Sequence, residues 1–192
     1  MEKIADKIIL RTAKVEDAER LVEIYSYYVT NTAVTFEWEV PSVQEFAQRI
    51  KDRQGKFPYI VAEYNGQLIG YAYSSLFRTR IAYSWCTETS IYLDKDFRRC
   101  GAGSILLAEL EKQLKAQNYI NVYACVTYIE NEDEYLTHDS VEFHKKMGYT
   151  QVARFNKCGF KFNRWYDVVW LEKMLGDHNE NPGFIQKPQN NL

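Results

Sequence analysis

The sequence contains few cysteines and no long hydrophobic run, and both observations limit the cellular compartments in which the protein is expected. Its four cysteines, Cys86, Cys100, Cys125 and Cys158, are widely spaced and form no CxxC pair or Cys/His cluster of the kind that binds zinc. The apolar runs are only a few residues long, and charges interrupt the first ten residues. We therefore expect a cytoplasmic protein with free thiols, no bound metal, no secretory signal and no contact with membranes.

The sequence also lacks an excess of charge of either sign. It contains 24 Lys and Arg and 26 Asp and Glu, which gives a formal net charge of −2 at pH 7. This balance argues against a surface that coats nucleic acid or an anionic membrane, and it favours a small-molecule or protein partner. Aromatic residues are plentiful at 15%, including 15 tyrosines. They fit either a densely packed core with aromatic edge strands, or an aromatic-lined pocket or subunit interface.

One domain is expected, because 192 residues with 46% hydrophobic content can bury a single full core. We place it at residues 1–175 and expect a polar, flexible tail at 176–192, which contains two prolines. Alternating patterns predict strands, and three-and-four spacing predicts helices. Strands are expected at 8–11, 59–64, 67–73, 83–93, 122–126, 149–155 and 165–171, and helices at 18–29, after Ser42, around 107–114 and at 140–147.

Local signals support several of these elements. Asn65-Gly66 between two strand patterns predicts a tight hairpin, because both central residues of a type I′ turn need positive φ. Ser42 with Glu45 three residues later predicts a capping box at a helix start. The order strand, glycine-containing turn, helix, strand between residues 83 and 126 predicts a crossover that joins two parallel strands.

The segment from Arg98 to Ser104 carries the most chemical information. It follows a predicted strand and opens a predicted helix, so several backbone N–H groups and the positive end of the helix dipole converge there. Gly101 and Gly103 let the backbone approach an anion, and Arg98 or Arg99 adds charge. The segment has neither a dinucleotide GxGxxG motif nor the Lys-Ser/Thr of a P-loop. These features predict a site for the phosphate of a different cofactor, and a plain tight turn is the alternative.

Arg98-x-x-Gly101-x-Gly103 resembles the R/Q-x-x-G-x-G/A motif with which the GNAT acetyltransferase superfamily holds the pyrophosphate of coenzyme A. The order of elements over residues 8–174 is also similar. The resemblance implies an α/β (α+β) fold, whose mixed, mostly antiparallel central sheet is flanked by helices and splays into a CoA-binding cleft. It implies acetyl-CoA as cofactor, with contacts from Ile91, Tyr92, Leu93, Arg98, Arg99, Cys100, Gly101, Ala102, Gly103, Ser104, Asn131 and Ser140.

Within that superfamily the sequence resembles the phosphinothricin/methionine sulfoximine acetyltransferases. Several short blocks match in the same order, at 24–25, 29–30, 35–37, 77–83, 88–92, 144–149 and 159–161. The resemblance implies direct transfer of an acetyl group from acetyl-CoA to the primary amine of a small amino-acid-like substrate. It also implies a homodimer, with Lys161 and Trp165 in the last hairpin serving either packing or the subunit interface.

Acetyl transfer to an amine requires a base for the ammonium proton and an acid for the departing thiolate. Glu88 corresponds to the proposed catalytic glutamate of the family, acting directly or through a water; otherwise it is a solvated or ion-paired strand residue. His144 occupies the helix position that handles protons near the cofactor sulfur, where many relatives outside the subfamily have tyrosine. Its unperturbed pKa of roughly 6.5 suits either acid or base chemistry, and a structural role is the alternative.

Substrate contacts are expected in two segments. Arg78 and Arg80 lie with Tyr83 in an Arg-and-aromatic region, where an arginine can bind a substrate carboxylate through two hydrogen bonds. Phe36 and Glu37, between the first two helices, are expected to form the opposite wall. The alternative for the arginines is a surface loop with solvated charges.

One departure from the family concerns the connection before the last helix. Relatives have a short Asn-x-x-Ser there, whereas this chain carries ten residues from Asn131 to Ser140, so that only the serine keeps its spacing to His144. The acidic insertion could select a cationic substrate, close as a lid or lie solvated. Alternative functions are acetylation of a peptide, protein or polyamine, and a non-catalytic acyl-CoA sensor.

Overall fold

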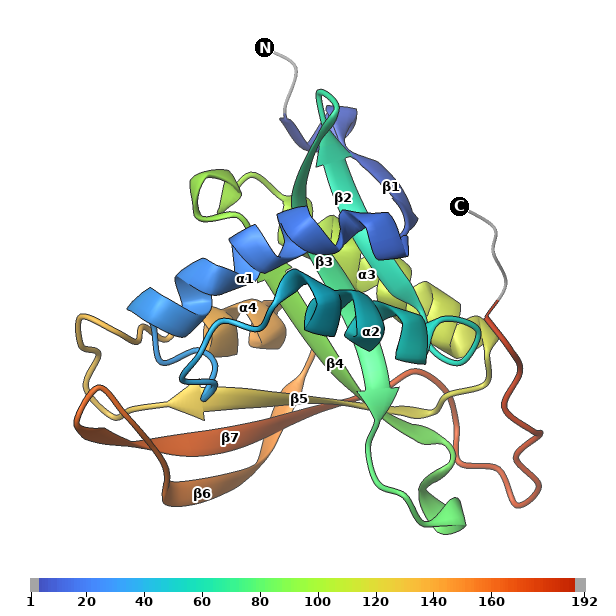
Figure 1. Cartoon of the computed structure of the whole chain (residues 1–192). Coiled ribbons are helices and arrows are strands. Elements are labelled where there is room, and N and C mark those ends of the chain that lie inside the picture. The colour runs from blue at the N-terminus through green and yellow to red at the C-terminus, as the bar shows by residue number, and fades with distance from the viewer. Residues whose placement is uncertain (1–3, 189–192) are drawn as a thin grey trace.

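The computed structural model describes residues 4–188, in which seven strands form one sheet in the order β1-β2-β3-β4-β5-β7-β6 (Figure 1). All neighbouring strands are antiparallel except β4 and β5, which are parallel. The strands are β1 (Ile9–Thr12), β2 (Tyr59–Tyr64), β3 (Gln67–Leu76), β4 (Cys86–Leu93), β5 (Asn121–Tyr128), β6 (Thr150–Lys161) and β7 (Arg164–Met174), and the helices are α1 (Ala18–Asn31), α2 (Val43–Arg53), α3 (Ala102–Ala116) and α4 (Asp139–Lys146).

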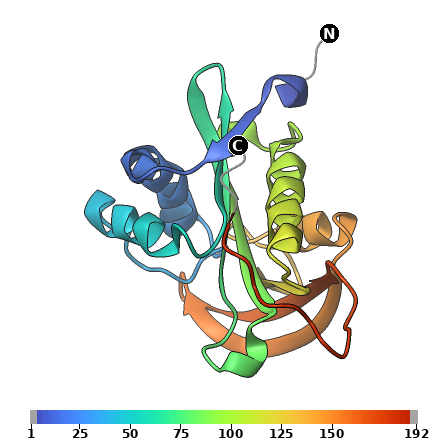
Figure 2. The same cartoon turned by 90° about the vertical axis from the view of Figure 1, so that its right-hand side faces the viewer.

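Helices cover both faces of this sheet, and each face has its own hydrophobic core. Helices α1 and α2 pack on one face around Leu21, Phe46 and Tyr71, while α3 packs on the other through its leucines. Figure 2 shows α1 and α2 on one side of the sheet and α3 and α4 on the opposite side. The predicted mixed, mostly antiparallel sheet flanked by helices is confirmed.

Most of the predicted local signals are observed. Asn65 and Gly66 have φ of 50° and 78° and join β2 to β3. The Ser42 hydroxyl accepts the Glu45 N–H at 3.1 Å and caps α2, but the Glu45 carboxylate pairs with Arg49 instead of completing the capping box. Strand β4 begins three residues later than expected, because the Tyr83 N–H closes a 3-10 turn on the Arg80 carbonyl.

The parallel pair β4 and β5 separates before either strand ends. Their pairing covers only Cys86↔Asn121, Thr87↔Val122 and Glu88↔Tyr123, although β4 continues to Leu93 and β5 to Tyr128. Beyond Glu88 the two strand edges therefore face each other without pairing. The predicted splay in the sheet is observed at this point.

Residues 176–188 form no helix or strand, but several backbone carbonyls in this segment accept hydrogen bonds from the domain. Trp85 donates its indole N–H to Gly183 at 2.8 Å, and Gln117 donates its side-chain amide to Gln186 at 2.9 Å. Ile185 packs against the larger core. The rest of the segment expected to be a flexible tail, residues 189–192, lies outside the described residues. No helix within residues 4–188 is long and apolar enough to span a membrane.

Replacing Gly70 by alanine is expected to destabilise the fold. A Cβ at Gly70 would overlap the Leu93 side chain and lie 2.9 Å from the Tyr92 carbonyl oxygen on the neighbouring strand. Overpacking of this kind costs about 1–3 kcal/mol in free energy of unfolding, and each kcal/mol lowers Tm by roughly 2–4 °C. Thermal denaturation should show the loss for Gly70→Ala and none for Gly176→Ala, where nothing lies within 4 Å. Equal Tm values for the two variants would show that the β3–β4 contact relaxes freely.

Candidate functional site

A cleft lies where β4 and β5 separate. Its two long walls are the consecutive residues 89–92 of β4 and 124–127 of β5, so both walls are strand edges. Edge strands expose backbone N–H and C=O groups that other sheet positions use for pairing. The cleft is completed by side chains from three further segments: Val34, Leu136, Ser140 and His144.

The glycine loop lies at the N-terminus of α3. Gly101 has φ of 95° and precedes the first helical residue, Ala102, and Arg99 also has a positive φ of 59°. The first N–H groups of a helix have no intrahelical partner, so those of residues 102–104 are free to bind an anion. A Cβ at Gly103 would lie 3.4 Å from both Leu93 and Phe143. The loop therefore packs closely against the end of β4 and against α4.

The charged side chains of this loop are held by different helices. Arg98 stacks over Tyr27 and Tyr28 of α1, with its guanidinium 5.1 and 5.4 Å from the ring centroids. Arg99 forms an exposed ion pair with Asp139 at the start of α4, at 3.2 Å. Both arginines can therefore reach an anion at the loop only by leaving or sharing these partners.

The other residues of the loop described here, Cys100, Ala102 and Ser104, have uncharged side chains. Cys100 donates its thiol to the Phe97 carbonyl and packs on the larger core, and Ser104 is exposed. Ala102 is buried. Any contact between these three residues and an anion would therefore come mainly from the backbone.

Glu88 lies at the closed end of the cleft, where it is the last residue of β4 that pairs with β5. Its register partner on β3 is Ser75, so its side chain shares a sheet face with Tyr73 and with α1 and α2. Burial raises the pKa of Glu88, and the positive charge of Arg78 partly offsets that shift. A carboxylate in this position is a stronger base than an exposed one.

Cys125 lies next to Glu88 on the cleft wall formed by β5. Burial, followed by the negative charge of Glu88, raises the pKa of the Cys125 thiol to about 12. A thiol with so high a pKa is not ionised at neutral pH and is a poor nucleophile. Cys125 is therefore not an activated nucleophile.

His144 lines the cleft from α4 and is only 4% exposed. Its Nδ1–H donates to the Ser140 carbonyl at 2.8 Å, because a carbonyl can only accept, and Nε2 is left as the unprotonated nitrogen. Burial lowers the pKa of His144, although the hydrogen bond to Ser140 opposes the shift. The ring is therefore neutral at pH 7. Its edge contacts with Phe143 and Tyr149, at 5.2 Å between centroids, fix its orientation.

Two of the predicted substrate residues that follow β3, Arg78 and Tyr83, contact the Phe77 ring. Arg78 stacks over Phe77 at 4.5 Å, and Tyr83 contacts the same ring edge-on at 5.9 Å. Arg78 also lies 5.6 Å from Trp170, which places it above the sheet near Glu88. Arg80 is exposed and caps the 3-10 turn instead of joining this group.

The predicted residues after α1 occupy separate positions. The Phe36 ring packs directly on Gly159 of β6, where any Cβ would overlap it. Glu37 forms a two-hydrogen-bond ion pair with Arg49 of α2, at 2.8 and 3.2 Å. Phe36 therefore packs against the β6–β7 hairpin, whereas the Glu37 side chain points toward α2.

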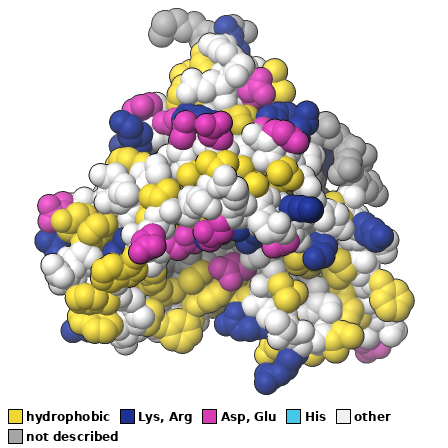
Figure 3. Space-filling model, in the orientation of Figure 1, with side chains coloured by type: hydrophobic (Ala, Val, Ile, Leu, Met, Phe, Trp, Pro, Cys, Tyr) yellow, Lys and Arg dark blue, Asp and Glu magenta, His cyan; other side chains and the backbone are white. Residues whose placement is uncertain are grey.

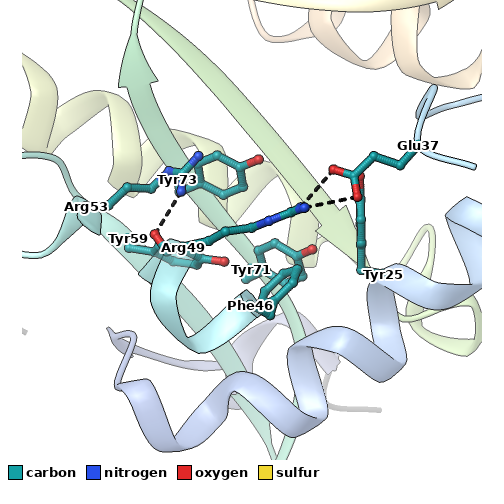
Figure 4. Close-up of a pocket in the computed structure, with 8 residues that line it drawn as sticks. All are labelled: Tyr25, Glu37, Phe46, Arg49, Arg53, Tyr59, Tyr71 and Tyr73. Atoms are coloured by element: carbon teal, nitrogen blue, oxygen red, sulfur yellow. Dashed lines mark hydrogen bonds and ion pairs between the residues drawn. The ribbon is translucent and has the colours of Figure 1, made fainter. Parts of the chain in front are cut away.

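Figure 4 shows a second pocket, of about 260 Å³, between α1, α2 and the strands β2 and β3. Glu37 is its only lining residue that the sequence argument singled out for the substrate. Sequence reasoning missed its two arginines because they lie in the last turns of an amphipathic helix, where solvated charge is usual. The lining side chains are Tyr25, Glu37, Phe46, Arg49, Arg53, Tyr59, Tyr71 and Tyr73.

The acidic insertion is tied to the β6–β7 hairpin. Asp133 accepts hydrogen bonds from Arg164 at 2.9 Å and from the Tyr166 hydroxyl at 3.0 Å, and Glu134 also pairs with Arg164. Its apolar Leu136 lines the cleft and Ser140 lies beside it, whereas Asn131 is exposed and outside the lining. The carboxylates of Asp133 and Glu134 are thus already paired, so these two do not offer an open cation site.

The arrangement matches a known family. A family model described as "Acetyltransferase (GNAT) domain" matches residues 10–170. This chain belongs to the GNAT acetyltransferase family. The splayed parallel strands and the glycine loop of this acetyltransferase lie within the matched residues.

Curated relatives and solved structures agree with that assignment. The phosphinothricin N-acetyltransferase of Streptomyces viridochromogenes is 30% identical over 85% of this chain and 86% of its own. The L-methionine sulfoximine/L-methionine sulfone acetyltransferase of Salmonella typhimurium is 26% identical over 88% and 95% of the two chains. The phosphinothricin acetyltransferase structure from Sinorhizobium meliloti, in complex with AcCoA, has a TM-score of 0.81 and 31% identity, covering 97% of this chain and 95% of that one.

The buried neutral His144 is expected to make stability depend on pH. In the unfolded chain the imidazole titrates near its ordinary pKa of roughly 6.5, whereas burial lowers the pKa of His144 in the folded protein. Its contribution is therefore complete above about pH 6.5 and is lost as the pH falls, because the unfolded state then binds the additional proton.

Urea denaturation at about pH 7 and about pH 5 tests this dependence. Wild type should lose more stability over the interval than His144→Asn, which keeps an N–H donor and does not titrate. Lys146→Asn, at an exposed position on the same helix, is the control and should behave as wild type. Identical pH dependence in wild type and His144→Asn would contradict the assignment.

Proposed function

We propose that this acetyltransferase moves the acetyl group of acetyl-CoA directly to the primary amine of a small, amino-acid-like substrate. The observation that carries the proposal is the position of Glu88 at the closed end of the cleft, with the anion-binding loop at the other end of β4. One strand thus links the proposed base, a half-buried carboxylate, to the proposed phosphate site. Relatives that are named phosphinothricin and methionine sulfoximine acetyltransferases support the substrate class.

The residues present fit coenzyme A. The free N–H groups at 102–104 and the loop arginines suit its phosphates, while the unpaired edge of β4 at residues 91–93 suits the amides of its pantetheine arm. We assign Ser140 to the cofactor side as well, since it lies in the cleft wall. When bound, acetyl-CoA supplies an activated thioester.

Proton transfer is assigned to two cleft residues. Glu88 removes the ammonium proton of the substrate, directly or through a water, and its raised pKa suits that role. His144 is neutral, carries its proton on Nδ1 and presents Nε2 as an acceptor. Its Nε2 would accept the second proton that the amine loses on acylation and pass it to the departing thiolate as the C–S bond breaks, so the ring ends neutral as it began.

Substrate orientation is assigned to the aromatic group beyond β3. Arg78, stacked on Phe77 and close to Glu88, binds the substrate carboxylate, with Arg80 and Tyr83 at the outer rim. Phe36 forms the opposite wall beside Gly159. A substrate space bounded by these residues would suit an amino acid better than a peptide.

We also propose a homodimer that works in the cytoplasm. Figure 3 shows hydrophobic side chains gathered over the β6–β7 hairpin, at the lower left. Phe155, Phe160 and Trp165 of this hairpin and the nearby Trp38 are between 38% and 66% exposed. Such aromatic surface is typical of subunit interfaces. The four cysteines are free thiols, which suits a reducing compartment.

Glu88→Gln is expected to lower kcat for amino-acid analogues by about 10²- to 10⁴-fold, since the amide cannot accept the ammonium proton. In wild type, kcat/KM should fall as the pH drops through the raised pKa of Glu88, because the protonated carboxyl is no longer a base. CoA-thiol release with phosphinothricin and methionine sulfone measures both effects. Glu63→Gln, on β2, is the control. Undiminished turnover in Glu88→Gln would remove this residue from the proton transfer.

Gly101→Ala is expected to raise Kd for acetyl-CoA about tenfold, because a side chain at φ of 95° strains the loop that presents the N–H groups. Isothermal titration calorimetry measures the change. Gly55→Ala is a matched control: its φ is 73°, and nothing lies within 4 Å of the added Cβ. If both variants bind acetyl-CoA like wild type, the loop is not the phosphate site.

A further inference from the structure

The closed end of the cleft is held by more than the pairing of its two strands. The Trp85 carbonyl, one residue before β4, accepts the N–H groups of Ile120 and Asn121 at 2.9 and 3.1 Å. The Trp85 side chain donates its indole N–H to the Gly183 carbonyl at 2.8 Å. Trp85 therefore joins the start of β4 both to the start of β5 and to the C-terminal segment, residues 176–188.

The same Gly183 carbonyl also accepts a hydrogen bond from the β5 side. Asn118, in the turn between α3 and β5, donates its side-chain amide to this oxygen at 2.7 Å. A carbonyl oxygen has two lone pairs, so it can accept from Trp85 and from Asn118 together. Because Trp85 leads into β4 and Asn118 leads into β5, the C-terminal segment links the two strands at the end where they are still paired.

Further contacts fix the C-terminal segment on the domain. The Gln117 side-chain amide donates to the Gln186 carbonyl, and the Gln186 N–H donates to the Gln117 carbonyl, each at 2.9 Å. Ile185 packs on the larger core, whereas its neighbour Phe184 is 88% exposed. Figure 1 draws this segment in red at the right, beside the end of α3 that leads to β5. Ile185 is thus the apolar anchor of the segment.

A second series of contacts runs from this segment toward the predicted substrate residues. His178 donates its Nε2–H to the Asn121 side-chain oxygen at 2.9 Å, and the Asn121 amide donates to the Tyr123 hydroxyl at 3.3 Å. The Tyr123 ring stacks on Phe77 with 4.4 Å between centroids, and the Arg78 guanidinium lies 4.5 Å from the same Phe77 ring. The C-terminal segment is therefore connected to the start of the loop between β3 and β4.

Trp85 connects it to the other end of that loop and to the proposed base. Three residues after Trp85 comes Glu88, the last residue of β4 that pairs with β5. We propose that Trp85 is a positioning residue: held by the C-terminal segment, it fixes Glu88 and the loop that carries Arg78 relative to each other. The proposal rests on the function proposed above, in which these two residues meet the amine and the carboxylate of the substrate.

Additional bonds matter at this end because little pairing opposes further opening. Strands β4 and β5 pair at only three positions before their edges separate. A shift of about 1 Å between a base and its substrate can slow a reaction about 10²-fold. The glycine loop at residues 98–104 follows the opposite end of β4. Release of the C-terminal segment should therefore affect the amine substrate more than the cofactor.

Two full-length variants release the segment from opposite sides. Trp85→Phe combined with Asn118→Gly removes both donors to the Gly183 carbonyl, and glycine tolerates the φ of 73° at position 118. Ile185→Asp removes the apolar anchor. Phe184→Ser, at the exposed neighbouring position, is the control. Circular dichroism at the assay temperature establishes that each variant is folded.

Kinetics, cofactor binding and amide exchange then give three separate readouts. In both variants kcat/KM for methionine sulfone should fall about three- to tenfold, while Kd for acetyl-CoA stays within about twofold of wild type. Hydrogen exchange followed by NMR should become about tenfold faster at the N–H groups of Ile120 and Asn121, which bond to the Trp85 carbonyl. Phe184→Ser should match wild type in all three measurements.

Several results would overturn the proposal. Equal losses in kcat/KM and in affinity for acetyl-CoA would show general support of the fold instead of positioning. Faster exchange with unchanged kcat/KM would also exclude positioning, and unchanged exchange in both variants would show that the segment does not hold the closed end. If wild type releases CoA thiol with no amine while exchange at Ile120 and Asn121 still rises in the variants, the proposed function is refuted and the hold on the closed end is supported.

Discussion

The separation of β4 from β5 is the constraint on which the rest of this structure depends. Three paired positions hold the two parallel strands together, and Glu88 is the last of them on β4. Backbone groups in a sheet interior must normally be paired, so an opening of this length needs other groups to fill it. Leu136 and His144 enter from outside the sheet, and the remaining edge is left for a ligand. The positions of the proposed base and of the proposed cofactor site both result from the point at which β4 and β5 stop pairing.

The sequence predicts the elements along the chain better than it predicts the contacts between them. The Asn65-Gly66 turn and the glycine loop at Gly101 could be found because positive φ is a local requirement that few residues meet. The parallel pair followed from the order of elements alone. The family resemblance added the splay, which no local pattern along β4 or β5 indicates.

Other features of the site depend on contacts between distant segments. Nothing around Arg53 in the sequence distinguishes it from Arg49 four residues earlier, because the difference lies in which glutamates can reach each one. Tyr71 alternates along β3 like any core residue, and only the packing shows that its hydroxyl has no partner. The acidic insertion resembled a solvated loop in sequence, yet Arg164 and Tyr166 hold Asp133 from the opposite hairpin.

The stacking of Arg98 on α1 has a consequence for how the two ligands communicate. Arg98 contacts Tyr27 and Tyr28, and the Tyr28 hydroxyl donates to the Leu93 carbonyl at the end of β4. Helix α1 also supplies Tyr25 to the pocket on the other side. An anion that drew Arg98 away from these rings would alter the same helix that lines this pocket. By thermodynamic linkage, a ligand in the pocket and an anion at the loop would then change each other's affinity by the same factor.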